Sequence, residues 1–200
     1  MDEALMQRQE RFHVKQKVAL AVNKYEVTAA GPDGADGETV AFAQQKRMVL
    51  KERVAFYESQ DEERLRFAFR ARSVVDLGAG YDVTDADGQV VGTFEKKFRS
   101  SLLRSTWMLR QEGQEPLTGR ERSTFVALVR RVWQVVPFVD MLPFAWPYHF
   151  DFTGADGRTV MSVTKKFSLV DRYVLDIASP DLDRRLAIAQ AVALDALQSR

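Results

Sequence analysis

Cysteine is absent from the 200 residues of this chain, and histidine occurs only at positions 13 and 149. Without cysteine there are no disulfides, no thiolate nucleophiles and no zinc sites built on sulfur. His13 and His149 lie far apart in the sequence, so neither stands at metal-ligand spacing from another histidine. We therefore expect no metal site and no cofactor.

Catalytic signatures are missing as well. The sequence contains no Gly-x-Ser-x-Gly elbow, no His-Glu-x-x-His pair and no glycine-rich phosphate loop between a strand and a helix. His149 and Asp151 would form a dyad on one predicted strand, but no nucleophile accompanies them, which favours packed or solvated side chains. Asp85-Ala86-Asp87-Gly88 resembles part of a calcium loop, yet Val83 and Phe94 occupy ligand positions of that loop. We expect neither an enzyme nor a calcium site.

A surplus of one charge sign is missing too, because 29 basic residues stand against 28 acidic ones. No bulk field therefore favours nucleic acid or an acidic membrane, and such a partner would need a local patch. The first residues, MDEALMQRQERF, lack the apolar segment of a secretory signal. We expect an N-terminal extension at 1–11, a single domain at 12–200, no nucleic-acid partner and a cytoplasmic location, free or peripheral at the membrane.

What the chain does contain is a repeat. Residues 87–98 read DGQVVGTFEKKF and residues 156–167 read DGRTVMSVTKKF, with the same spacing from Asp-Gly to Lys-Lys-Phe. A looser third copy runs from Asp36-Gly37 through Val40 to Gln45-Lys46-Arg47. Apolar and polar residues alternate on both sides of each Asp-Gly pair, which is the pattern of two half-buried strands joined by a tight turn.

Further alternating segments flank each predicted hairpin. They are residues 12–18 and 53–59 in the first unit, 66–74 and 105–111 in the second, and part of 132–146 with 172–178 in the third. Three units of four strands give about twelve strands, and a sheet of that size usually closes to remove its edges. We predict a mainly β fold: an antiparallel closed barrel of about twelve strands.

The C-terminal segment has a different character. Ser179-Pro180-Asp181 is a helix start signal, and we predict a helix over 181–198. Only Gln190 is polar between Leu186 and Leu194, so this helix is either buried or within a membrane. A membrane span needs roughly 20 apolar residues, and this run is shorter and has charged residues near its ends. We therefore predict that the barrel encloses the helix.

The segment between the second and third units is the least repetitive. Residues 123–136 carry apolar residues at helical spacing, with Arg130 and Arg131 on the other side, and predict a helical insert. Prolines within 137–150 exclude a membrane-spanning helix there. The insert either caps one end of the barrel as a lid or lies in a membrane interface. In the second case three aromatic residues would lie at headgroup depth: Phe138, Phe144 and Trp146.

Four segments resemble bacterial, especially actinobacterial, members of the LURP-one-related family. They are LKERVAFYE, RARSVVDLGAGYDVTDADG, FEKKFRSSLLRSTW and TKKFSLVDRYVLDI. The resemblance extends from about Phe12 to Leu197. It implies the Tubby C-terminal-like fold, which the family shares with phospholipid scramblases and in which the C-terminal helix fills the barrel. Tubby-like relatives bind phosphoinositides through basic side chains on the barrel surface, and scramblases act on membrane lipids.

A lysine pair ends each of the two closest repeats. Adjacent residues of a strand point to opposite faces, so each pair presents one ammonium group to the outer surface. Such lysines either protect strand ends or, as the resemblance suggests, bind lipid headgroups. The headgroup candidates are the following basic residues: Lys97, Lys166, Lys46, Arg130 and Arg131.

Two functions follow from these observations. The first is a non-enzymatic, peripheral module that binds anionic lipid headgroups without spanning the membrane. The alternative is an intracellular scaffold that binds a protein partner through an apolar patch around Trp146.

Overall fold

Twelve antiparallel strands and two helices make up the part of the chain that the structure describes. The structure is a computed structural model and describes residues 1–18, 22–46, 53–73, 80–97, 106–122, 149–166 and 172–197. The helices are α1 (Glu3–Arg8) and α3 (Arg184–Ala196). The strands are β1 (Arg11–Val18), β2 (Val22–Ala30), β3 (Asp36–Lys46), β4 (Arg53–Tyr57), β5 (Leu65–Ala71), β6 (Tyr81–Asp85), β7 (Val90–Lys97), β8 (Thr106–Arg110), β9 (Leu117–Glu121), β10 (His149–Thr153), β11 (Thr159–Lys166) and β12 (Arg172–Ile177).

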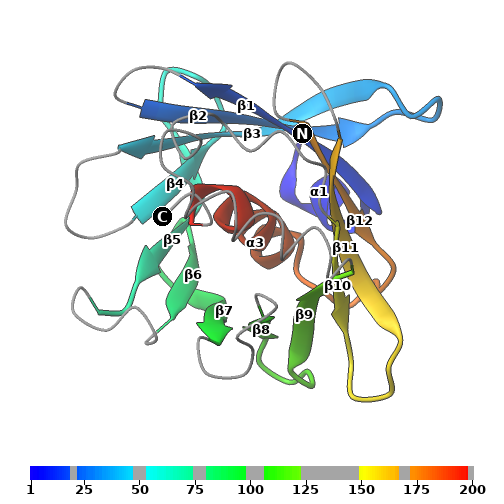
Figure 1. Cartoon of the computed structure of the whole chain (residues 1–200). Coiled ribbons are helices and arrows are strands. Elements are labelled where there is room, and N and C mark those ends of the chain that lie inside the picture. Colours follow the sequence, from blue (N-terminus) through cyan, green and yellow to red (C-terminus); the bar gives the residue numbers. More distant parts are fainter. Residues whose placement is uncertain are drawn as a thin grey trace, which may run out of the picture.

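The strands form a closed barrel in which each pairs with its neighbours in the sequence and β12 returns to pair with β1. Phe12 of β1 lies opposite Leu175 of β12 at this closure. Because both edges of each described strand are paired, none of these twelve strands offers an open edge for aggregation. The predicted antiparallel barrel is confirmed (Figure 1).

The barrel encloses α3, as predicted (Figure 1). Leu186, Ile188 and Val192 are each 0% exposed, although they point in different directions around the helix. The wall comes close to the helix, because a Cβ on Gly92 would stand 2.5 Å from Leu186 Cδ2 and 2.8 Å from a backbone oxygen of β8. Gln190 is also fully buried, and its amide has no hydrogen-bond partner among the described residues. Leaving such a group unpaired costs about 1–3 kcal/mol.

The helix begins later than the sequence predicted. Residues 181–183 are not helical; Asp183 is the N-cap, and its side chain accepts a hydrogen bond of 2.8 Å from the backbone N–H of Arg185. The backbone carbonyls of Ser179, Pro180 and Leu182 instead accept hydrogen bonds from the buried guanidinium of Arg184. The proline therefore belongs to a connector wrapped around Arg184, and not to the first helical turn.

The turns confirm two of the three predicted hairpins and correct the first. Gly88 and Gly157 adopt positive φ in the β6–β7 and β10–β11 turns, where the predicted Asp-Gly pairs lie. In the first unit Gly34 takes this position, and Asp36-Gly37 lies in β3. The repeat aligns the last residues of β3, β7 and β11. Because β3 has 11 residues whereas β7 and β11 have 8, this alignment places the first turn three residues too late in the sequence.

One barrel strand was predicted in the wrong place. Residues 132–146 lie outside the described residues, but β9 pairs with both β8 and β10 and so occupies the position expected for that strand. The sequence of β9, LTGRE, contains a glycine and charged residues, which weaken its strand signal. Gly119 is required there, since a Cβ would lie 2.4 Å from the Phe152 ring. The predicted helical insert at 123–136 also lies outside the described residues.

Residues 3–8 of the predicted N-terminal extension form α1, which packs at the end of the barrel where α3 begins. Met6 is 0% exposed. The Gln7 side chain donates to Asp183 at 3.1 Å and accepts from the backbone N–H of Arg184 at 3.0 Å. These contacts attach α1 to the start of the enclosed helix.

Candidate functional site: the basic rim of the barrel

The two ends of the barrel carry opposite charges. We call the end that bears the described turns and α1 the turn end. Its connecting segments contain many carboxylates and only two basic residues, Arg64 and Arg158. The acidic residues of these described connections are Glu10, Asp33, Glu58, Asp61, Glu62, Glu63, Asp87, Glu112, Glu115, Asp156, Asp181 and Asp183. Although the net charge of the chain is near zero, acidic residues are concentrated at this end of the barrel.

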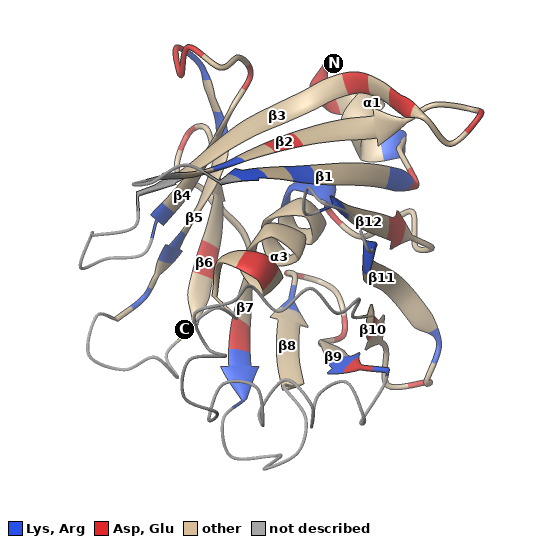
Figure 2. Cartoon of the chain, turned by 45° about the horizontal axis from the view of Figure 1, so that its top comes forward, with Lys and Arg blue, Asp and Glu red and all other residues tan. Residues whose placement is uncertain are grey.

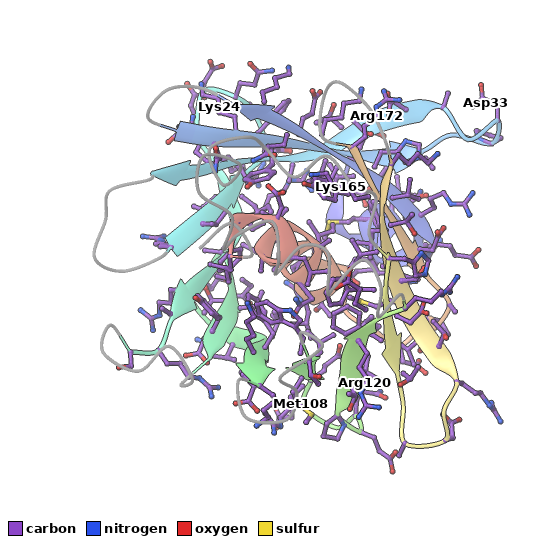
Figure 3. The ribbon with its side chains drawn as sticks, viewed as in Figure 1. Lys24, Asp33, Met108, Arg120, Lys165 and Arg172 are labelled. Atoms are coloured by element: carbon purple, nitrogen blue, oxygen red, sulfur yellow. The ribbon has the colours of Figure 1, made fainter. Side chains whose placement is uncertain are left out.

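Lysine and arginine residues lie around the other end of the barrel, where β7, β9 and β11 finish and β4 and β12 begin (Figure 2). We call these outward-facing lysines and arginines the basic rim. They are Lys17, Lys24, Arg53, Arg70, Arg72, Lys97, Arg120, Arg122, Lys166 and Arg172. They come from strands all around the barrel, so the rim is a ring and not a patch on one side (Figure 3).

Half of the rim is already neutralised by ion pairs. Lys17 pairs with Glu26 at 3.5 Å, Arg72 with Asp82 at 2.6 Å, Lys97 with Glu95 at 2.7 Å and Arg122 with Asp151 at 2.8 Å. Arg172 pairs with Asp36 at 2.9 Å. The remaining members are exposed and make no hydrogen bond or ion pair with the part of the chain that the structure describes: Lys24, Arg53, Arg70, Arg120 and Lys166. These five cations are available to an anionic partner.

The structure places two of the predicted headgroup residues on this rim. Lys97 and Lys166 both point outward, but four strand positions separate β7 from β11, so they share an end of the barrel and not a side. Lys46 is the last residue of β3, and its side chain lies outside the described residues. The other candidates also lie outside the described residues: Arg130, Arg131, Phe138, Phe144 and Trp146.

The first lysine of each repeated pair points inward. Lys96 Nζ lies 5.8 Å from the centroid of the Trp107 ring, and Lys165 Nζ lies 5.5 Å from that of Tyr173. Lys165 is only 8% exposed, and Figure 3 shows it inside the barrel. A cation over an aromatic face is attracted by the negative charge of that face. The repeated pairs thus place one lysine inside and one outside, as the period of a strand requires.

The interior lysines are part of a polar layer at the rim end of the core. The carboxylate of Asp195, near the end of α3, accepts hydrogen bonds from the hydroxyls of Tyr25, at 2.9 Å, and Tyr173. The Gln16 side chain donates to Tyr25 Oη at 3.4 Å. These contacts tie the last turn of the enclosed helix to β1, β2 and β12.

His149 and Asp151 do form the predicted contact, on the outer face of β10. His149 Nε2 lies 2.8 Å from Asp151, and its Nδ1 lies 2.7 Å from the Thr164 hydroxyl. Partial burial raises the pKa of Asp151, but hydrogen bonds from Arg122 and His149 outweigh this effect and leave its pKa below the ordinary value. Since Arg122 occupies both carboxylate oxygens, the arrangement is that of a packed polar cluster.

A second polar cluster joins three strands on the outer face. Asp36 of β3 is 2.5 Å from Lys15 Nζ, 2.9 Å from His13 Nδ1 and 2.9 Å from the Arg172 guanidinium. The hydrogen bond from Lys15 is the main cause that lowers the pKa of Asp36 to about 2; partial burial opposes it, and His13 and Arg172 add to it. The carboxylate therefore gathers cations that would otherwise repel each other.

Asp36→Asn should lower the free energy of unfolding by about 1 kcal/mol at neutral pH, a value reduced for solvent screening. Because the folded pKa is depressed, the ionised carboxylate stabilises the fold above its ordinary pKa of 3.8, and this contribution disappears as the pH falls through about 2. Urea unfolding should thus separate variant and wild type at neutral pH and bring them together near pH 2. Glu63→Gln, an exposed control, should behave as wild type; an Asp36→Asn protein of unchanged stability at neutral pH would contradict the assignment.

No helix among the described residues is long and apolar enough to cross a membrane. The same residues contain no cluster of three or more potential metal ligands.

Sequence reasoning missed most of the cations without partners. Arg53, Arg70 and Arg120 follow no repeated motif; each is simply the outward-facing residue nearest one end of its strand. Only the positions of the strand ends reveal them.

Comparison with known proteins identifies a family for this chain. Searches of curated proteins and of solved structures give no match. The family model described as LURP-one-related matches residues 39–195, which include β4 to β12 and nearly all of α3. The chain therefore belongs to the LURP-one-related family.

Proposed function

We propose that this LURP-one-related protein is a non-enzymatic, peripheral membrane-binding module, and that its basic rim binds anionic lipid headgroups. The observation that carries the proposal is the set of five exposed rim cations that have no partner among the described residues, on the end of the barrel opposite the acidic turns. Several cations of such a ring can contact a flat anionic surface at the same time.

Electrostatics supports an end-on orientation. Each lysine or arginine near an anionic membrane contributes about 1 kcal/mol, and the attraction decays within a Debye length of about 10 Å. The acidic turn end would be repelled by the same surface, so the charge polarity of the barrel directs the rim towards the lipid. The cytoplasmic leaflet is rich in anionic lipids, so we propose a cytoplasmic location with peripheral membrane contact.

Vesicle sedimentation tests the proposal with the full chain. We expect binding to phosphatidylcholine vesicles that contain phosphatidylserine, loss of that binding as salt is raised, and no binding to pure phosphatidylcholine. Failure to sediment with either vesicle at low salt would refute it, and so would equal binding to both. The alternative of a protein scaffold around Trp146 stays a prediction, because that residue lies outside the described residues.

A further inference from the structure

A cavity of about 250 Å³ opens at the turn end, opposite the basic rim. It lies between the β8–β9 turn, the β10–β11 turn and the connector that precedes α3. Its volume is near the lower limit of ligand pockets, which span ~300–1,000 Å³. All of its lining residues lie in the part of the chain that the structure describes.

The floor of the cavity is aliphatic. It is formed by Leu109, Leu117, Val160, Leu182 and Leu186, from three strands, the connector and the enclosed helix. Leu117 and Leu182 are 8% and 6% exposed. Such a floor favours a compact apolar group, because burying apolar surface contributes about 25 cal/mol per Å².

The wall formed by Gln111 is fixed in position. Its Nε2 donates to the Asp181 carbonyl at 2.9 Å, and its Oε1 accepts from the Asp183 N–H at 2.8 Å. Gln111 therefore attaches the β8–β9 turn to the connector and keeps the walls apart. This arrangement is a preformed site, as ligand pockets usually are.

The charged residues at the mouth of the cavity are acidic, which favours a cation. Glu115 and Asp156 line it, and neither lysine nor arginine does. Asp156 is engaged with the backbone N–H of Arg158 at 2.9 Å and with its guanidinium at 3.2 Å. Glu115 has no hydrogen bond or ion pair within the described chain, so its carboxylate is available to a cation. The acidic surroundings of the whole turn end also attract cations and repel anions.

The combination of an aliphatic floor and a carboxylate unpaired within the described chain occurs at the cavity of the third unit and not at the corresponding cavity of the second. The cavity between the β4–β5 and β6–β7 turns is lined by charged groups, and not by an aliphatic floor. Arg64 and Arg66 pair there with Glu58 at 3.3 Å and 3.2 Å. Both arginines are therefore paired there, whereas Glu115 has no ion pair with any described residue.

We propose that the cavity binds a small organic cation, with a compact apolar body on the aliphatic floor and an ammonium group paired with Glu115. The class includes primary amines that carry an aromatic or short aliphatic group. This site is independent of lipid binding, since it uses the opposite end of the barrel.

Heteronuclear NMR titration of the isotope-labelled full chain tests the proposal with three probes of one shape: benzylamine, benzyl alcohol and benzoate. We expect benzylamine to cause saturable amide shifts in the two turns and around Leu182 and Leu186, benzyl alcohol to bind more weakly, and benzoate not to bind. Glu115→Gln should weaken benzylamine about fivefold and leave benzyl alcohol unchanged.

Matched variants separate the site from general charge effects. Glu112→Gln removes a neighbouring carboxylate that does not line the cavity, and it should leave benzylamine affinity within twofold. Val160→Phe should fill the cavity and abolish binding; if that protein does not fold, Ala155→Trp at the exposed mouth serves the same purpose. Equal binding of benzoate, equal weakening by Glu112→Gln, or unchanged binding after the cavity is filled would each overturn the proposal.

Discussion

Val192→Asp should abolish the folded barrel. Val192 is 0% exposed on a helix enclosed on all sides by strands. A carboxylate there would have no water and no partner, and burying it costs several kcal/mol even after protonation or relaxation. Domains have about 5–15 kcal/mol of stability in total. The neutral amide of Gln190 is tolerated in the same helix, but the free energy cost of burying a charged group there is comparable to the total stability of the fold.

Far-ultraviolet circular dichroism and urea unfolding provide the measurement. Val90→Asp is the matched control, because Val90 is the same residue type but is 54% exposed at the start of β7. We expect the control to unfold like wild type and Val192→Asp to lack a cooperative transition. A cooperative transition at wild-type urea concentration in Val192→Asp would contradict an enclosed helix.

The triple variant Arg53→Gln, Arg120→Gln and Lys166→Gln should weaken binding to phosphatidylserine-containing vesicles about 100-fold. These residues stand on β4, β9 and β11, are exposed, and make no hydrogen bond or ion pair with other described residues. At about 1 kcal/mol for each cation near an anionic surface, removing three costs about 3 kcal/mol. Vesicle sedimentation over a range of lipid concentrations measures the change.

A control of equal charge comes from the turn end. Arg8→Gln, Arg64→Gln and Arg158→Gln also removes three cations, which are exposed and belong to α1 and two turns. If the rim binds the membrane, this variant should bind within threefold of wild type. Equal weakening by both triples would mean that net charge, and not the rim, governs binding.

The architecture was largely readable from the sequence because its signals are local and repeated. The alternation around Asp87-Gly88 and Asp156-Gly157 predicts hairpins, and the long apolar run after Leu186 predicts a buried helix. The strand β9 was not predicted because its inward-facing residue Gly119 has no side chain and so breaks the alternation of apolar and polar residues. What makes that glycine necessary is the Phe152 ring on a strand about thirty residues away, a tertiary contact that no local pattern reveals.

The candidate site was less accessible to sequence reasoning. The repeated motif drew attention to Lys97, which the structure shows in an ion pair with Glu95. That pairing was foreseeable, since residues two apart share a strand face. Arg53 of β4 and Arg120 of β9 lie five strand positions apart and share one rim only when the barrel closes, so their common position depends on the whole fold.

The closure of β12 against β1, with α3 following, has a consequence for biosynthesis. The strand β1 can pair with β2 at once, but its other edge waits for β12, since Arg11 lies opposite Asp176. The barrel interior also stays unfilled until the segment Arg184–Ala196 has been synthesised. The barrel can therefore be completed only after β12 and α3 have been synthesised, and contacts of such sequence separation make its folding slow. Until α3 is in place, the apolar inner faces of the twelve strands are exposed, so we expect chaperone capture during synthesis.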